Sequence, residues 1–375
     1  MTHALVPKIL MTPKNEENPY LPLLRQALSE VGVISDWLTM KWTPSQTLNT
    51  LVFPAELVLG RLRGFNVLHL HWVYSFRWNW TRRLPLVRRL PRWWFGFILW
   101  FASVIGFRMV YTSHEPLPLV PAFDDDVAGR RPLFKRSRAV ITITEDAKRR
   151  LCEMFGLGSD LVEVIPEGAP MVGPAPKRED ARQELGVSMA TPLVVMFGHL
   201  DPYKGVDLLL EAAIDLPRAA ELAIRLLGDT ANLQYASRLS GLVERLQRQG
   251  RDVRWERGVF SADDLEVLLV AADLVAIPFR FITNSTSLRV AMSRRVPVLV
   301  PGLPELEDVP AEAVFRYDHT TKTGLRDALA AALCASPEEV AARVVAAYAW
   351  TTAWTWHDVA IATKAIYERV LQDAP

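Results

Sequence analysis

The sequence has little cysteine and almost no net charge. Only two cysteines, Cys152 and Cys334, occur in 375 residues, and they lie in different halves of the chain. This excludes a disulfide framework and is typical of a protein in a reducing compartment, with both thiols in the core. The 43 basic and 42 acidic residues leave a formal charge of +1. Because so small a charge creates no global attractive field, we expect no nucleic-acid partner.

Long apolar runs are missing as well. The uncharged stretch 93–107 (WWFGFILWFASVIGF) has fifteen residues. As a helix it would span about 22 Å, whereas the hydrocarbon core of a bilayer is about 30 Å thick. The N-terminus (MTHALVPKILMTP) lacks a basic region followed by an apolar stretch and a small-residue cleavage site, so we expect no secretory signal. These absences predict a cytoplasmic protein without a membrane span.

Arginine and tryptophan are plentiful just before this apolar stretch. Residues 77–92 (RWNWTRRLPLVRRLPR) interleave six arginines with Trp78 and Trp80. Such a composition is typical of a segment that lies in a lipid headgroup layer. A buried helix with a solvated basic approach explains the same pattern, and both interpretations can hold together. We therefore expect residues 77–107 to contact a membrane surface, peripherally and at the inner face of the plasma membrane.

Strands and helices alternate along the rest of the chain. Expected strands lie within 66–73, 107–115, 138–144, 162–168, 192–200, 222–229, 253–258, 272–278 and 296–301, and expected helices within 145–155, 205–216, 233–249 and 261–272. Alternation of this kind gives parallel sheets with helices on both faces. The proline-rich stretch 169–180 is typical of a linker. The sequence thus predicts an α/β protein with two doubly wound, Rossmann-like domains, 1–172 and 181–350, that face each other across a cleft.

Small, basic and polar residues follow each strand of the second domain. They are Gly198, His199 and Lys204 after the first strand, Gly228 and Asp229 after the second, Arg257 after the third, and Asn284, Ser285, Thr286 and Ser287 after the fourth. Glycine allows a ligand to approach the backbone closely, and Lys204 adds a positive charge just ahead of a helix. This set of residues suits a diphosphate.

The turn 284–287 has two interpretations. It joins a buried strand to a helix, where serine, threonine or asparagine can cap the first turn or contact an anion. As caps alone these residues would contribute stability and no binding. The motif by itself does not decide between the two roles.

The second half resembles the nucleotide-binding domain of GT-B glycosyltransferases, in particular the family-four group. The residues that carry the resemblance are 194–212 (VVMFGHLDPYKGVDLLLEA), 224–229, 253–278 and 291–301, with 110–115 and 139–168 in the first half. The resemblance covers most of the chain. It implies a GT-B fold, a nucleotide-sugar donor bound by the second domain, an acceptor bound by the first, and a final helix, 351–375, that packs back onto the first domain.

The chain departs from the family at three positions. His199 stands where the family has arginine, and Ile282 and Val290 stand where it has two glutamates. The turn 284–287 is similar to a divergent bacterial subset that builds polysaccharides. The resemblance implies transfer to a lipid-linked or polysaccharide acceptor, with GDP-mannose as the first expected donor and a UDP-sugar as the next. The missing glutamates leave an alternative, a non-catalytic nucleotide- or carbohydrate-binding protein that kept the fold.

Candidates for proton transfer lie in the first half. Glu115 and His114 directly follow an expected strand and are the first candidates for a catalytic base. His71 and Asn18 are expected on the acceptor side. The acidic run 124–126 could hold Mg²⁺, but it lies far in sequence from the phosphate-binding strand ends and is expected to be an acidic loop or a helix start. We therefore predict a metal-independent enzyme without a cofactor.

Overall fold

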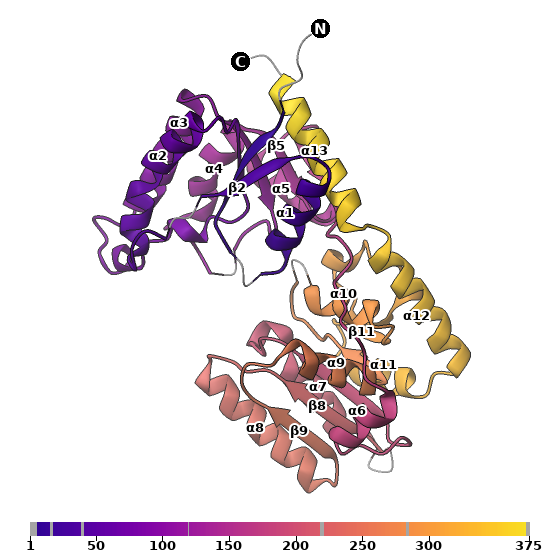
Figure 1. The fold of residues 1–375 in the computed structure, drawn as a ribbon. Helices are drawn as coiled ribbons and strands as arrows, with labels where there is room; N and C mark the ends of the chain where they lie inside the picture. The colour runs from indigo at the N-terminus through magenta and orange to yellow at the C-terminus, as the bar shows by residue number, and fades with distance from the viewer. Residues whose placement is uncertain are drawn as a thin grey trace. The chain divides into compact units, whose positions relative to one another are not determined.

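The computed structural model describes residues 6–15, 18–38, 41–118, 120–217, 221–282 and 285–372, without the side chains of Arg82 and Arg83. The chain forms two compact units (Figure 1). Unit 1 comprises 1–168 together with 354–375, and unit 2 comprises 169–353. The boundary at 168/169 falls at the start of the proline-rich stretch, which has no regular structure until a helix begins at Arg178.

Unit 1 is built on a six-stranded parallel sheet with the order β2-β1-β3-β4-β5-β6. Its strands are β1 (Lys8–Thr12), β2 (Ile34–Trp37), β3 (Val67–Leu70), β4 (Arg108–Ser113), β5 (Ser137–Thr142) and β6 (Val162–Val164). Its helices are α1 (Tyr20–Glu30), α2 (Gln46–Leu62), α3 (Leu90–Val104), α4 (Asp126–Arg136), α5 (Glu145–Phe155) and α13 (Trp356–Gln372). β1 and β3 lie side by side in the sheet. After β1 the chain continues to β2 at one edge, and after β3 it continues through β4 and β5 to β6 at the other edge.

Unit 2 repeats this architecture with the strand order β12-β11-β10-β7-β8-β9. Its strands are β7 (Leu193–Phe197), β8 (Ala223–Leu227), β9 (Asp252–Glu256), β10 (Leu274–Ala276), β11 (Val298–Pro301) and β12 (Phe315–Tyr317). Its helices are α6 (Arg178–Glu184), α7 (Val206–Ile214), α8 (Leu233–Arg248), α9 (Ala262–Ala271), α10 (Thr286–Ser293), α11 (Gly324–Leu333) and α12 (Pro337–Thr352). All strand pairs are parallel.

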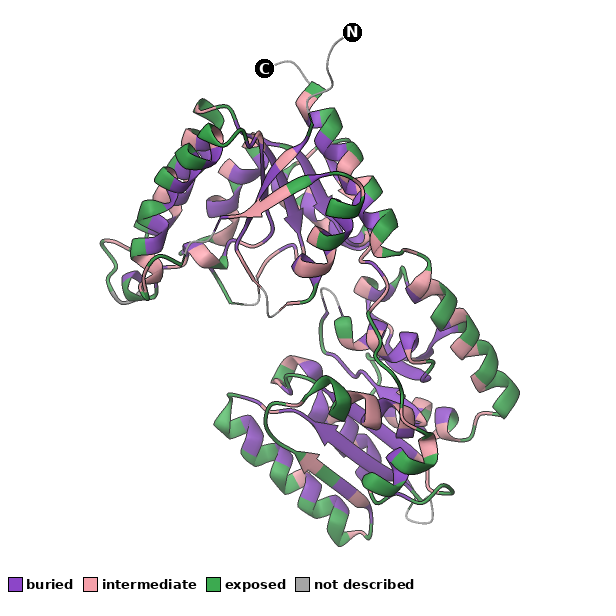
Figure 2. Cartoon of the chain, in the orientation of Figure 1, coloured by how far each residue is buried: buried purple, intermediate pink, exposed green. Residues whose placement is uncertain are grey.

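Continuous apolar strands explain the position of both cores. β3, β7, β8, β10 and β11 are buried along their whole length, as strands covered by helices on both faces must be. In Figure 2 the central strands are purple and the outer faces of the helices are green. The prediction of two doubly wound parallel sheets is confirmed.

The helix ends follow local sequence signals. The predicted helix 145–155 agrees with α5, whose N-cap Thr144 accepts a hydrogen bond from the Ala147 amide and whose C-cap Gly156 is left-handed. α9 begins with a capping box formed by Ser261 and Asp264. At the end of the chain, α12 extends to Thr352 and α13 begins only at Trp356, so the last helix is shorter than the expected 351–375.

Within the ranges that the structure covers, no helix is long and apolar enough to cross a membrane. α3, which contains most of the uncharged stretch, packs on unit 1 through one face and buries Phe95, Ile98, Leu99 and Ala102.

Candidate active site

The strand order of unit 2 places its ligand-binding edge at β7 and β10. From β7 the chain proceeds to β8 and β9 on one side, and it then returns to β10, beside β7, and continues to β11 and β12 on the other. Ligands of doubly wound sheets bind at such a switch point, beyond the carboxyl ends of the strands. The loops that meet there are 198–205 after β7 and 277–285 after β10. They hold half of the predicted donor-binding residues, and Thr286 and Ser287 follow directly in the first turn of α10.

Gly198 brings three of these residues together. Its φ of 100° lies in the left-handed region that glycine favours. A Cβ atom built on it would lie 2.8 Å from Lys204 Nζ and 3.8 Å from Ser287 Oγ. The first distance is too short for real atoms, so a side chain at Gly198 would displace the lysine. Gly198, Lys204 and Ser287 therefore converge on one point of the sheet edge.

Lys204 is almost fully buried at this point. Its side chain is 7% exposed, and Nζ lies 3.5 Å from the Phe197 carbonyl oxygen and 5.3 Å from the ring centroid of Phe279. Burial lowers the pKa of Lys204 to about 8, although the nearby Asp201 carboxylate opposes the shift. Within the described part of the chain its one hydrogen bond is this weak carbonyl contact, so the buried ammonium is poorly compensated. An anionic ligand would supply the missing charge.

The residues after β8 and β9 support the same edge. Gly228 has a φ of 138°, and a Cβ atom there would lie 1.9 Å from the Gly198 carbonyl oxygen, so the two loops pack backbone to backbone. Asp229 accepts hydrogen bonds from Arg257 Nε and Nη2 at 3.0 and 2.8 Å. These hydrogen bonds lower the pKa of Asp229. The two predicted residues are therefore paired with each other, and His199 is exposed beside them.

The turn before α10 divides its roles between two serines. Ser285 is the N-cap, and its Oγ accepts a hydrogen bond from the Leu288 amide at 3.1 Å. Ser287 is half-buried and faces Gly198, whereas Thr286 is exposed. Asn284 lies outside the described residues. One serine thus caps the helix and another is directed toward Gly198.

Sequence reasoning missed the group that fixes the loop after β10. Arg280 donates two hydrogen bonds to Asp207, at 2.9 and 2.8 Å, and Tyr235 donates a third to the same carboxylate at 2.7 Å. Burial by itself would raise the pKa of Asp207, but these hydrogen bonds lower it. This ion pair ties the loop that carries Phe279 to the first turn of α7. The sequence signal that could have found it is an aspartate three positions after Lys204, within an otherwise apolar segment.

Three histidines form a row in unit 1, of which His69 and His71 are fully buried and His114 is partly buried. His69 contacts the Tyr367 hydroxyl at 2.6 Å and the Thr112 hydroxyl at 2.8 Å. His71 Nδ1 lies 3.2 Å from His114 Nε2, while the buried Nε2 of His71 has no partner in the part of the chain that the structure describes. Burial lowers the pKa of His114 to about 3 and that of His71 well below its usual value. All three rings are neutral at pH 7.

The pKa of Glu115 is shifted in the opposite direction from that of the histidines. Burial raises the pKa of its carboxyl group, an effect that Arg130 opposes and Asp126 strengthens. Its backbone oxygen accepts hydrogen bonds from Ser113 Oγ at 2.9 Å and from Arg130 Nη1 at 3.4 Å, which fix the chain after β4. A carboxylate with a raised pKa is a stronger proton acceptor than an exposed one.

The other expected residues of unit 1 have local structural contacts. Asn18 Oδ1 accepts a hydrogen bond from the Tyr20 amide at the start of α1. Of the acidic run, Asp125 caps α4, and Asp126 accepts hydrogen bonds from the amides of Ala122 and Phe123. The interpretation of this run as a helix start is confirmed. Among the described residues no cluster of three or more His, Cys, Asp or Glu side chains could hold a metal ion.

No protein-family model matches the chain. A D-inositol 3-phosphate glycosyltransferase of Nocardia farcinica is 30% identical over 158 residues, which are 40% of this chain and 34% of that protein. The protein of the same name from Mycobacterium bovis is 27% identical over 251 residues, 65% of this chain and 51% of that protein. The chain thus spans between about a third and a half of the length of these relatives.

Solved structures match over almost the whole chain. Sucrose-phosphate synthase from Thermosynechococcus elongatus has a TM-score of 0.75 and 16% identity, and the match covers 97% of this chain and 99% of that one. HepE of Anabaena, in complex with UDP and glucose, has a TM-score of 0.69 and 16% identity over 98% of this chain and all of its own. The resemblance inferred from the sequence is confirmed for the fold, which is GT-B, and in sequence the chain is similar to relatives that are named glycosyltransferases.

Proposed function

We propose that the chain is a glycosyltransferase that takes a sugar from a nucleotide-sugar donor bound by unit 2. The observation that carries the proposal is the convergence of Gly198, Lys204 and Ser287 beside the first turn of α10. A buried ammonium and a helix N-terminus both stabilise the negative charge that develops on a departing diphosphate. HepE, a neighbour in fold, was solved with UDP-glucose, which supports a donor of this class.

In this proposal unit 1 binds the acceptor and Glu115 is the base. The acceptor hydroxyl attacks the anomeric carbon, the bond from that carbon to the diphosphate oxygen breaks, and, if configuration is inverted, Glu115 takes the hydroxyl proton. The raised pKa of Glu115 supports this role. His114, with a pKa of about 3, is a weak base. In this proposal His114 makes a hydrogen bond to the substrate and does not act as the base.

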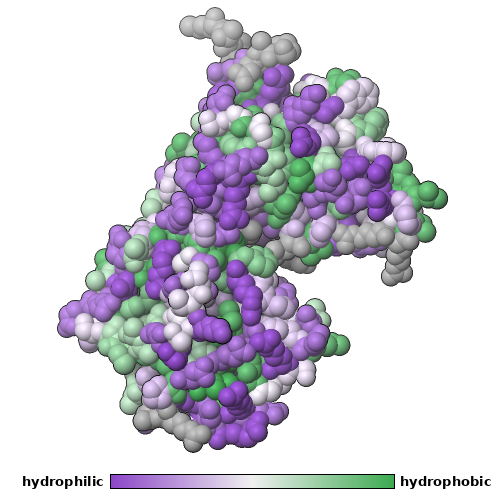
Figure 3. Space-filling view, turned by 180° about the vertical axis from the view of Figure 1, so that it is seen from behind, coloured by the Kyte–Doolittle hydropathy of each residue, from purple (hydrophilic) through white to green (hydrophobic). Residues whose placement is uncertain are grey.

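The proposed acceptor is lipid-linked, and the support comes from α2 and α3. α3 exposes Trp93, Phe97, Trp100 and Val104 to between 40% and 62%, at the i, i+4, i+7 and i+11 spacing of one helix face. α2, which packs beside α3, exposes its own apolar stripe, Leu48, Leu51, Val52, Val58, Leu59 and Leu62. In the rear view of Figure 3 hydrophobic residues reach the surface along the outer edge of unit 1. Together these residues form the α2–α3 face.

Cations and tryptophan indicate what covers the α2–α3 face. Arg88 and Arg89 are exposed just before α3, and Leu86 is fully exposed beside them. Trp80 is also half-exposed. Arginine beside exposed tryptophan and leucine suits an anionic lipid surface. The proposal is peripheral attachment at the inner face of the plasma membrane in bacterial glycan synthesis.

Turnover on a donor panel tests the function. The purified chain is incubated with GDP-mannose, UDP-glucose and other nucleotide sugars, with and without a membrane extract as acceptor source, and released nucleoside diphosphate is measured. We expect release from one donor, dependent on acceptor and unchanged by EDTA. Donor binding without release under any of these conditions would favour the non-catalytic alternative that the missing glutamates at 282 and 290 suggest. Loss of activity in EDTA would contradict metal independence.

A further inference from the structure

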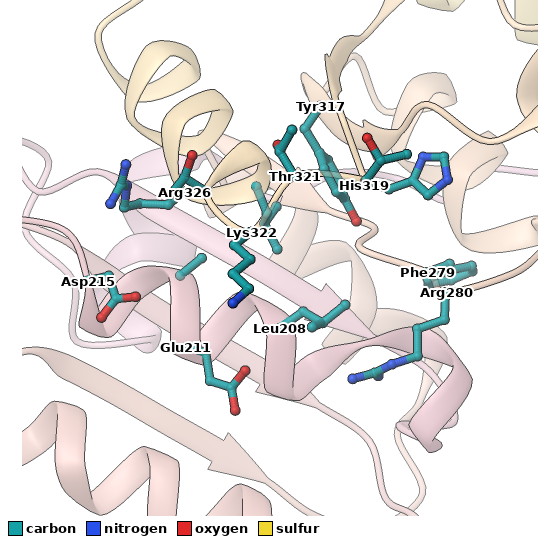
Figure 4. Close-up of a pocket in the computed structure, with 14 residues that line it drawn as sticks. Leu208, Glu211, Asp215, Phe279, Arg280, Tyr317, His319, Thr321, Lys322 and Arg326 are labelled. Atoms are coloured by element: carbon teal, nitrogen blue, oxygen red, sulfur yellow. The ribbon is translucent and has the colours of Figure 1, made fainter.

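Unit 2 contains a concave site between α7 and the connection from β12 to α11. This cavity has a volume of about 540 Å³ (Figure 4). Its floor is made by buried side chains, namely Ala212, Phe279, Tyr317 and Leu325. Polar side chains, among them Asp215, His319 and Lys322, stand at its rim. We call it the α7–α11 pocket.

The α7–α11 pocket is a neighbour of the proposed donor site and not a part of it. The two share the Phe279 ring, which lines the pocket and lies 5.3 Å from Lys204 Nζ. From there the pocket follows α7 to Asp215, nine residues beyond the start of the helix, a distance of about 13 Å. Neither Gly198, Lys204 nor Ser287 lines it. A ligand in this pocket would therefore use different polar groups from a donor diphosphate.

The hydroxyl group of Tyr317 indicates that this pocket binds a ligand. Its side chain is only 5% exposed and lines the pocket. Figure 4 shows its hydroxyl directed into the cavity. No hydrogen-bond partner for this hydroxyl occurs among the residues that the structure places. Buried tyrosine hydroxyls are normally paired, so this one is available to a ligand that can donate or accept a hydrogen bond.

The charges of the lining indicate the class of ligand. Three of the charged residues already have ion-pair partners, namely Arg280 with Asp207, Glu211 with Arg238, and Arg326 with Asp327. Lys322 and Asp215 remain, and neither side chain has an ion-pair or hydrogen-bond partner within the described ranges. The charges of these two unpaired side chains cancel, so the pocket has no net positive charge that would attract an anionic ligand. Lys322 offers hydrogen-bond donors and Asp215 offers acceptors. This matches a ligand whose own groups can both donate and accept hydrogen bonds.

We propose that the α7–α11 pocket binds a neutral, hydroxyl-rich carbohydrate of about disaccharide size. Sugar hydroxyls can donate to Asp215 and accept from Lys322 and Tyr317, while the C–H faces of the sugar rings pack on the apolar floor. This site is independent of the transfer reaction, so its failure would leave the proposed function intact.

Titration of the full chain with defined sugars tests the proposal. Maltose, cellobiose and sucrose are the neutral probes and glucose 1-phosphate is the anionic one, with binding followed by calorimetry and saturation-transfer NMR. At least one neutral disaccharide should bind, with or without saturating UDP or GDP. Tyr317→Phe should weaken it about 2- to 10-fold, as expected for one lost hydrogen bond, and Asp215→Ala with Lys322→Ala by about tenfold or more.

The matched control is Tyr348→Phe, which removes the same hydroxyl from an exposed tyrosine on α12, outside the pocket. It should bind the disaccharide like the parent. Thermal unfolding of every variant shows whether unit 2 is folded. Absence of binding by all three neutral sugars, binding of glucose 1-phosphate alone, competition by UDP or GDP, or equal affinity in the Tyr317→Phe variant would each overturn the proposal.

Discussion

Lys204 is the residue whose environment says most about donor binding. Its ammonium is buried, and among the described residues no carboxylate lies within hydrogen-bond distance of it, so a diphosphate would gain a charge-assisted contact there. Lys204→Ala should weaken the binding of nucleoside diphosphate about 10- to 100-fold, which corresponds to roughly 1.5 to 3 kcal/mol. Calorimetric titration measures this change. Unchanged affinity would remove Lys204 from the site.

The pKa of Lys204 makes the same contact dependent on pH. Because burial lowers this pKa to about 8, the ammonium loses its proton as the pH rises through 8. If only the protonated form binds, affinity should fall about tenfold between pH 7 and pH 9. The effect of Lys204 on stability has the opposite sign. Between pH 8 and its unfolded pKa of 10.5 the unfolded chain holds more protons, so the free energy of unfolding rises.

The histidine row in unit 1 distinguishes the role of His114 from that of Glu115. The sequence alone offered both residues as candidates for the catalytic base. An unpaired buried N–H costs more than an unpaired buried acceptor, so we expect His71 to donate through Nδ1 to His114 Nε2 and to leave its own Nε2 bare. Neutral His114 then carries its proton on Nδ1. It is a hydrogen-bond donor and has no free lone pair for base catalysis.

This assignment predicts different pH–rate profiles for two variants. Glu115→Gln removes the proposed base and should lower kcat about 100-fold or more, with little change in donor affinity. His71→Phe keeps an aromatic ring but removes the partner of His114, so it should lower kcat less and leave the acidic limb of the profile, set by Glu115, in place. An acidic limb that persists in Glu115→Gln would show that another group is the base.

At the scale of elements, the N-terminus of α10 provides a matched pair of serines. Ser285→Ala removes the N-cap and should lower the free energy of unfolding by about 1 kcal/mol while the affinity for donor stays the same. Ser287→Ala should do the reverse, because its hydroxyl faces Gly198 and does not cap the helix. Denaturant unfolding and nucleotide titration of both variants separate the two effects. If Ser287→Ala binds like the parent, the turn is only a cap.

Much of this arrangement could be predicted because strands, helix starts and glycines leave local signals. β7, α7 and α10 follow from apolar runs, caps and breaks, and the parallel topology then brings the strand ends to one edge. The different roles of Ser285 and Ser287 could not be predicted, since they depend on which hydroxyl the first turn of the helix directs toward the sheet edge. Likewise, the pairing of Arg257 with Asp229 and of Arg280 with Asp207 joins residues that are distant in sequence.

The two helices of the α2–α3 face give a prediction about lipid binding. Trp93→Ser with Trp100→Ser removes two tryptophans that are 62% and 47% exposed and lie outside the buried face of α3, so unit 1 should stay folded. Cosedimentation with vesicles that contain phosphatidylglycerol should fall about tenfold or more, given the apolar area lost. The same vesicles at high salt should release part of the parent, because arginine contributes to binding. Equal binding by both proteins would mean that another partner covers this face.

At the scale of the whole chain, the last helix belongs to the first unit. α13 packs on α1, and it buries Val359, Ile366, Tyr367 and Val370 in the core of unit 1. The Tyr367 hydroxyl also contacts His69 in the histidine row at 2.6 Å. The resemblance predicted such a helix, but only the contacts show which core it completes. Unit 1 is therefore assembled from the two ends of the sequence, and unit 2 is continuous.

This arrangement predicts an unequal response to truncation at residue 353. Full burial of the four large side chains of α13 contributes at least about 6 kcal/mol, which is comparable to the whole stability of a domain. Without α13, unit 1 should lose its cooperative unfolding transition in calorimetry, while unit 2, which ends at 353, should keep its own transition and its affinity for nucleotide. Ile366→Ala in the full chain is the milder control, expected to cost about 2 to 5 kcal/mol in unit 1 alone. If the truncated chain kept both transitions, α13 would be an attachment to unit 1 and not a part of its core.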